Sequence, residues 1–142
     1  TTVISKSVGT NFDQSATCVS CPYCGGLDHA VFGQSVMNGK LRWYCSIACP
    51  ISGNSEEDGT GSGPFDLRAA LLKSQGTWGV LVESADKLNS VQIAKRTFAL
   101  STAASPPLLQ SFPLLRIGTK AEAEWLAETL SKERIRATAR LY

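Results

Sequence analysis

The chain has 142 residues, of which 43% are hydrophobic, and its formal net charge is +2. This length and composition allow one ordinary globular domain or two small ones, and the charge is far weaker than is usual for a nucleic-acid-binding domain. No apolar run approaches the length of a membrane span, and no basic stretch followed by an apolar one indicates a secretory signal, so we expect no membrane insertion.

Cysteine is concentrated in one part of the chain, because all five cysteines lie between residues 18 and 49. Their number is odd and their spacing is too crowded for a disulfide framework, so the pattern indicates metal binding. We therefore expect a cytoplasmic protein or one in another reducing compartment. Import into an organelle by a transit peptide that is later removed stays an alternative.

Residues 1–17 are polar and predict an N-terminal arm, and residues 18–53 predict a metal-binding finger. The cysteines of this finger have the spacing C-x2-C-x20-C-x3-C, in which each close pair grips one ion from a tight turn. Four thiolates in tetrahedral geometry suit zinc. The predicted ligands are Cys21, Cys24, Cys45 and Cys49, with Cys18 and His29 as substitutes.

The insert between the two cysteine pairs predicts a β-hairpin. AVFGQSV forms one strand, KLRWYC forms the return strand, and Asn38-Gly39 between them favours a tight turn. Trp43 lies in the return strand, where it packs in the small core of the finger or, if exposed, anchors a partner.

An iron–sulfur cluster is the alternative cofactor for these cysteines. Cys18, Cys21 and Cys24 form a C-x2-C-x2-C run, and Cys49 is followed by proline, as in the run of bacterial ferredoxins. A cluster on these four residues would leave Cys45 unused, so one zinc ion is the favoured cofactor.

The motif CPYCGG resembles the zinc knuckle of zinc-ribbon and treble-clef fingers. RWYCSIAC resembles the second half of treble-clef fingers of the TRASH, MYM, HIT and MYND kinds and of the bacterial gyrase-inhibitor finger. The insert is also similar to zinc ribbons of some insertion-sequence transposases. The resemblance covers residues 18–53 only, and Pro50 departs from it by shortening any helix after the last cysteine. It implies a structural zinc and a surface that binds protein or nucleic acid.

Residues 54–64 are rich in glycine, serine and acid and predict a mobile linker, and residues 65–142 predict an α+β domain. The expected elements of this domain are a helix over 66–74, a strand over 77–83, an ambiguous segment over 90–100, a proline-rich loop over 105–113, a strand over 112–118, a helix beginning with a capping box at Thr119 and Glu122, and an alternating strand over 134–141.

The expected fold class is therefore α+β, with a small zinc-knuckle hairpin domain followed by an α/β sandwich. A strand–helix–strand unit after another strand makes a ferredoxin-like arrangement a candidate. Residues 112–142 also resemble, weakly, the second half of SPOR-type repeats, and this resemblance implies the fold alone.

The last strand has a basic outer face. Arg134, Arg136 and Arg140 form one row, and Arg116 lies on the preceding strand. Such a row binds phosphates or the acidic side chains of a partner, or it is a solvated face that protects a sheet edge.

No combination of residues indicates catalysis, because the single histidine matches no nucleophile and four thiolates leave a zinc ion no open position. We therefore expect a non-enzymatic, zinc-binding accessory or assembly protein that mediates protein–protein interaction in a larger complex, with no small-molecule substrate. The alternatives are a DNA- or RNA-binding protein that uses the ribbon and the arginine row, and an iron–sulfur electron carrier.

Overall fold

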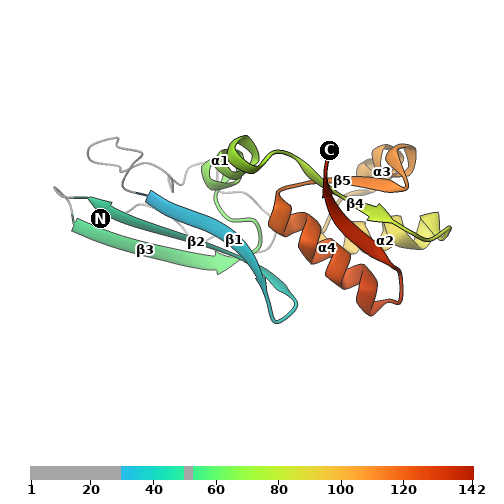
Figure 1. Ribbon diagram of the computed structural model, residues 1–142, viewed down its shortest axis with the longest axis horizontal. Coiled ribbons are helices and arrows are strands. Elements are labelled where there is room, and N and C mark those ends of the chain that lie inside the picture. The colour runs from blue at the N-terminus through green and yellow to red at the C-terminus, as the bar shows by residue number, and fades with distance from the viewer. Residues whose placement is uncertain (1–29, 50–52) are drawn as a thin grey trace. The chain divides into compact units, whose positions relative to one another are not determined.

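The structure is a computed structural model that describes residues 30–49 and 53–142 (Figure 1). The chain divides into two compact units, Thr1–Ser74 and Gln75–Tyr142, which we call unit 1 and unit 2. Each contains a three-stranded antiparallel sheet and at least one helix. The predicted α+β class is thereby confirmed, and the division falls after residue 74 instead of within an acidic linker.

Unit 1 is a meander of three strands followed by one helix. Its strands are β1 (Ala30–Met37), β2 (Lys40–Cys49) and β3 (Gly53–Thr60), in the sheet order β1-β2-β3, and its helix is α1 (Phe65–Gln75). Asn38 and Gly39 have positive φ values of 52° and 75°, as a type I′ turn between twisted strands requires. The predicted hairpin and the predicted first helix are confirmed.

Strand β3 corrects the prediction of a mobile linker over 54–64. It is an edge strand that pairs with β2, and the pairing places Gly59 opposite Trp43. A Cβ atom on Gly59 would lie 2.7 Å from the indole Nε1 of Trp43, and one on Gly63 would lie 2.6 Å from its Cγ. The glycines that suggested flexibility therefore leave room for a buried indole ring.

The inner face of the unit 1 sheet is defined by alternate residues of β2. Leu41, Trp43, Cys45 and Ile47 are all buried, as the two-residue period of a strand requires. The opposite face carries Tyr44, whose ring lies where a Cβ atom of Gly33 on β1 would be. A tyrosine that covers the glycine of a neighbouring strand keeps the sheet continuous on its outer face.

Unit 2 is built on a split β-α-β arrangement. Strand β4 (Trp78–Val82) lies between β5 (Leu114–Gly118) and β6 (Ala137–Leu141) and is antiparallel to both. Helix α4 (Lys120–Lys132) connects β5 to β6. Before β5 the chain forms α2 (Lys87–Thr97), the 3-10 turn η1 (Thr102–Ala104) and α3 (Ser105–Ser111).

The core of unit 2 lies between one face of this sheet and its helices. Val80, Val82 and Leu115 from the strands pack with buried side chains of α2, α3 and α4. Helix α4 presents an apolar face that contains Ala123, Leu126 and Leu130, all of which are fully buried. All three belong to this core. The capping box is also confirmed: Glu122 N–H donates to Thr119 Oγ1, and Thr119 N–H donates to Glu122 Oε1.

Two segments of unit 2 differ from the sequence prediction. For a third segment, the sequence left helix and strand open. Residues 105–111 form α3 instead of a loop, because prolines 106 and 107 lie in the first helical turn, where the missing N–H groups have no helical acceptor. Of the ambiguous segment over 90–100, residues 90–97 belong to α2, and the helix ends there. Strand β6 begins at Ala137 instead of residue 134.

The late start of β6 has a local cause at the end of α4. Arg134 has a φ of 62°, its N–H donates to Ser131 O, and Ile135 N–H donates to Leu130 O. This pattern is a Schellman motif with arginine at the left-handed position that glycine usually occupies. Buried Ile135 and Leu130 provide the apolar contact of the motif, and the strand can begin only after it.

Candidate binding surface

The candidate site is the face of the unit 2 sheet that none of the helices of unit 2 covers. The side chains on this face alternate with those that enter the core, and Arg116, Arg136, Thr138 and Arg140 are all exposed. We call it the basic face, formed by Gly79, Leu81, Leu114, Arg116, Arg136, Thr138, Arg140 and Tyr142.

Three strands bring two arginines to the same level of the basic face. Gly79 on the central strand pairs with Arg116 on one side and with Arg140 on the other. Because neighbouring strands lie about 4.8 Å apart, the two arginine Cα atoms are separated by roughly 10 Å. The sheet thus holds two guanidinium groups on either side of a residue that has no side chain.

Tyr142 fills the space above Gly79. A Cβ atom on Gly79 would lie 3.1 Å from both Cδ1 and Cε1 of the ring, and 2.6 Å from Leu115 O. The guanidinium carbon of Arg116 lies 5.5 Å from the centre of the same ring, at cation–π distance. Gly79 therefore lets an aromatic ring lie low on the sheet, and the ring supports one arginine of the row.

The arginines of the basic face have no acidic partner among the residues that the structure describes. The ion pairs found there are Arg42 with Asp58, Arg96 with Glu133 and Lys132 with Glu128. In unit 2, Arg96 and Lys132 are thus partly neutralised by neighbours, whereas Arg116, Arg136 and Arg140 have no such ion pair. This leaves positive charge concentrated on one face of the sheet.

The predicted arginine row is only partly what the structure contains. Arg136 and Arg140 share a face and Arg116 joins them across β4, as expected. Arg134 does not belong to this face, because it occupies the left-handed position that ends α4. Tyr142 was missed by the prediction, although it continues the alternation of residues 136, 138 and 140.

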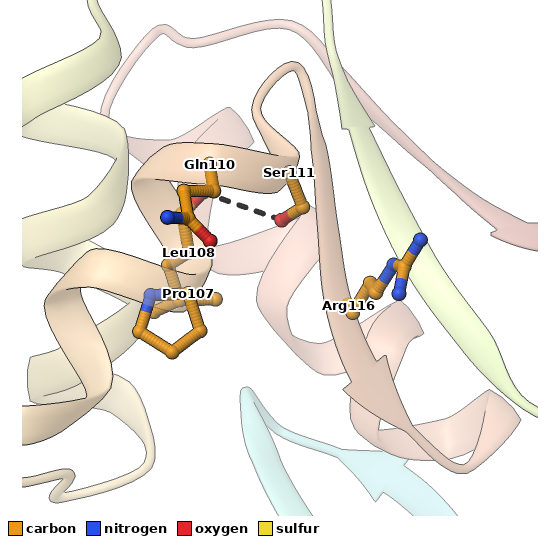
Figure 2. Close-up of a pocket in the computed structure, with 5 residues that line it drawn as sticks. All are labelled: Pro107, Leu108, Gln110, Ser111 and Arg116. Carbon is orange, nitrogen blue, oxygen red and sulfur yellow. Dashed lines mark hydrogen bonds between the residues drawn. The ribbon is translucent and has the colours of Figure 1, made fainter.

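A pocket of about 310 Å³ lies beside this face, between α3 and β5. Figure 2 shows four α3 residues on one side of β5 and the side chain of Arg116 extending from that strand toward β4. The Ser111 hydroxyl donates to Leu108 O at 3.3 Å, a bond within the helix. The lining residues are Pro107, Leu108, Gln110, Ser111 and Arg116.

Trp43 is not available as a partner anchor, which corrects its assignment as a partner-binding residue. Its side chain is 1% exposed, and its Nε1 atom has no hydrogen-bond partner within the described part of the chain. A residue packed beneath Gly59 and Gly63 stabilises unit 1 and cannot contact another molecule while the unit is folded.

Only two of the predicted metal ligands lie within the described residues. Cys18, Cys21, Cys24 and His29 lie outside them, and no cluster of three or more histidine, cysteine or acidic side chains that could hold a metal occurs inside them. Cys45 is buried, and Cys49 is the last residue of the same strand.

The second cysteine pair does not form the predicted tight turn, because β2 continues to Cys49. Residues four apart on a strand have Cα atoms roughly 13 Å apart at a rise of about 3.3 Å per residue. Two thiolates on one zinc ion, each at about 2.3 Å, bring their Cα atoms within roughly 10 Å. Cys45 and Cys49 therefore do not fit one ion in this strand conformation.

Comparison with known proteins gives no relative: no family model matches the chain, and neither the curated proteins nor the solved structures contain a match. Among the residues that the structure describes, no helix is both long and apolar enough to span a membrane.

Proposed function

We propose that this chain is a non-enzymatic accessory protein that binds an acidic surface of a partner protein through the basic face of unit 2. The observation that supports this proposal is the set of exposed arginines on one uncovered sheet face, each without an acidic partner among the described residues. Arg116, Arg136 and Arg140 would each pair with a carboxylate of the partner.

The composition of the basic face favours protein over nucleic acid. Half-buried Leu81 and Leu114 pair across the sheet in its centre, and Tyr142 lies at its end. An apolar centre with arginine and tyrosine around it has the residue types that dominate binding energy in protein interfaces.

Native co-purification with two matched variants tests this proposal. The tagged full chain is used to capture partners from nuclease-treated lysate of its source cells, beside R116Q/R136Q/R140Q and a control, K87Q/K95Q/K132Q, that removes the same charge from α2 and α4. We expect the wild type and the control to recover the same partner, and the arginine variant to recover at least about tenfold less, because several charge-assisted contacts are lost together.

Two results would overturn the proposal. One is equal recovery of the partner by the arginine variant and the control, since the basic face would then be dispensable. The other is loss of all binding after nuclease treatment, with affinity for random DNA or RNA falling steeply with salt, which is the response of phosphate contacts.

Zinc binding is a separate proposal, supported by the cysteine spacing and not by the described conformation of β2. Metal analysis of the full chain, beside a C45S variant, tests it. If Cys45 and Cys49 hold the same ion, the end of β2 must leave its strand conformation, and zinc should then accelerate amide exchange in β3. One zinc per chain with β3 still protected would show that the two cysteines do not share the ion. Visible absorption after anaerobic purification would instead support an iron–sulfur cluster.

We also propose a ferredoxin-like fold for unit 2 and a zinc-ribbon fold for unit 1. The split β-α-β of unit 2 supports a relation to ferredoxin-like folds, although its sheet contains three strands. For unit 1, the hairpin at Asn38-Gly39 supports a zinc-ribbon arrangement, while the cysteines that would complete the knuckle lie outside the described residues.

A further inference from the structure

We infer that the segment of the partner that contacts unit 2 carries an acidic side chain close to a large apolar one, with the carboxylate paired to Arg116 and the apolar group in the pocket between α3 and β5. This inference rests on the proposed function and names the chemistry of the partner. Arg116 is the residue that joins the two features, because it belongs to the basic face and also lines the pocket.

The pocket has the size and lining of a site for one side chain. Its volume of about 310 Å³ lies at the low end of the range for small-ligand sites, enough for a leucine or an aromatic ring. Pro107 and Leu108 give it apolar walls, whereas Gln110 and Ser111 give it a polar rim. A charged side chain would gain nothing from such walls, so the occupant should be apolar.

The direction of the Arg116 side chain places the carboxylate-binding position and the apolar pocket on different sides of β5. Its side chain extends from β5 toward β4, away from the α3 residues of the pocket (Figure 2). The carboxylate is therefore received above the sheet, and the apolar side chain is received on the α3 side of β5. A partner segment that crosses β5 would place two neighbouring side chains in these two positions.

The contact between Arg116 and Tyr142 prepares the guanidinium for this role. A guanidinium that lies over an aromatic ring still has N–H groups that can bind a carboxylate in a bidentate manner. The ring limits the rotamers of Arg116 before binding, so less conformational entropy is lost on association. Tyr142 is thus a positioning residue for Arg116.

Peptide selection on the full chain tests the inference without knowledge of the partner. A phage-displayed library of random peptides is selected on the wild type, and enriched peptides are synthesised and measured by fluorescence anisotropy. We expect them to contain aspartate or glutamate within a few residues of leucine, isoleucine, phenylalanine or tryptophan. Replacement of either residue type by alanine should weaken binding at least about tenfold.

Variants of the chain assign the two contacts. Gln110→Trp places a large side chain at the rim of the pocket, and Gln92→Trp makes the same change at an exposed position of α2. We expect Q110W to bind the peptides at least about tenfold more weakly and Q92W to bind them as the wild type does. Q110E, which preserves size, should also weaken binding by repelling the acid, and R116K should bind less tightly than the wild type but better than R116Q.

The outcomes separate this inference from the proposed function. One outcome would overturn the inference and leave the proposed function intact. In it, the selected peptides are acidic, depend on Arg116, Arg136 and Arg140, carry no apolar residue and bind Q110W as tightly as the wild type. Two other outcomes would also overturn the inference. In the first, the peptides bind R116Q/R136Q/R140Q with the same affinity as they bind the wild type. In the second, the library yields no peptide whose binding depends on Arg116. In the first of these cases the proposed function would lose its support as well.

Discussion

The two sheets of this molecule have the same number of strands but reach that architecture by different means. Unit 2 is formed by strands whose side chains alternate between core and solvent, joined by a helix that begins with a complete capping box. Unit 1 ends its sheet with GNSEEDGT, a strand with no apolar side chain. A strand of this composition forms only because a neighbour supplies the packing that its own residues lack.

That neighbour is Trp43. The comparison shows which structural features are specified by adjacent residues and which by residues far apart in the sequence. The indole ring needs two positions without a Cβ atom, and Gly59 and Gly63 provide them. The capping box of unit 2 is specified by adjacent residues, whereas the packing of β3 in unit 1 is shared between residues far apart in the sequence. Glycines that are typical of flexible linkers therefore serve here to leave space for a buried side chain.

Removal of the Trp43 ring should have the largest effect on the molecule. We expect Trp43→Ala to lower the free energy of unfolding by about 3–5 kcal/mol, because a buried ring is lost and β3 loses its packing partner. Urea denaturation followed by circular dichroism measures the loss, and amide exchange should place it in β2 and β3. Tyr44→Ala, at the adjacent exposed position, should cost less than about 1 kcal/mol. Equal costs would contradict the packing role of Trp43.

Glycine substitutions separate backbone strain from packing in unit 1. Gly63 and Gly53 have similar φ values, 85° and 90°, but a Cβ atom meets Trp43 only at Gly63, and at Gly53 it meets nothing within 4 Å. Each alanine variant should lose about 1–2 kcal/mol from the left-handed backbone. Gly63→Ala should lose a further 1–3 kcal/mol or so from overpacking, measured by the same denaturation experiment. If both variants lose the same, the glycines serve the backbone alone.

The capping box of unit 2 should have a smaller effect, because it is local. Thr119→Ala should lower the free energy of unfolding by about 1–2 kcal/mol, since it leaves the buried N–H of Glu122 without its acceptor. Thr129→Ala on the same helix is the control: its hydroxyl donates only to Trp125 O within the helix, so the change should be close to neutral. A cost at residue 129 as large as that at residue 119 would argue against the cap.

The ends of two helices offer a small stabilisation. Ala99, like Arg134, occupies the left-handed position of a Schellman motif, with Leu100 N–H donating to Lys95 O. Ala99→Gly should increase the free energy of unfolding by up to about 1 kcal/mol and so raise the midpoint of thermal unfolding. Arg134→Gly should gain less, because it also removes a cation from the C-terminal end of α4. A loss of stability in Ala99→Gly would contradict the strain assigned to this position.

In both units, the features that could be predicted from the sequence are those specified by adjacent residues. The Asn-Gly turn and the capping box are patterns of adjacent residues, and both were predicted correctly. The last strand was predicted correctly from Ala137 onward but not over residues 134–136. The helix over 105–111 was missed because prolines suit a first turn as well as a loop. The packing of Trp43 under two glycines, and the support of Arg116 by Tyr142, depend on strand pairing that no single stretch of sequence contains.

The candidate site was found in part for this reason. Alternation placed Arg136 and Arg140 on one face, and pairing across β4 was needed to bring Arg116 beside them. Arg134 was assigned to the row because alternation was extended through residues that belong to a helix cap. The pocket could not be predicted, since it requires α3 next to β5.

Arginine footprinting of the captured complex tests the central claim most directly. The free chain and its native complex are treated with phenylglyoxal, and the modified arginines are identified by mass spectrometry. The basic face predicts that Arg116, Arg136 and Arg140 react in the free chain and are protected in the complex, while Arg134, exposed and without an ion pair in the described residues, reacts in both. Unchanged reactivity of the three arginines in the complex would contradict the claim.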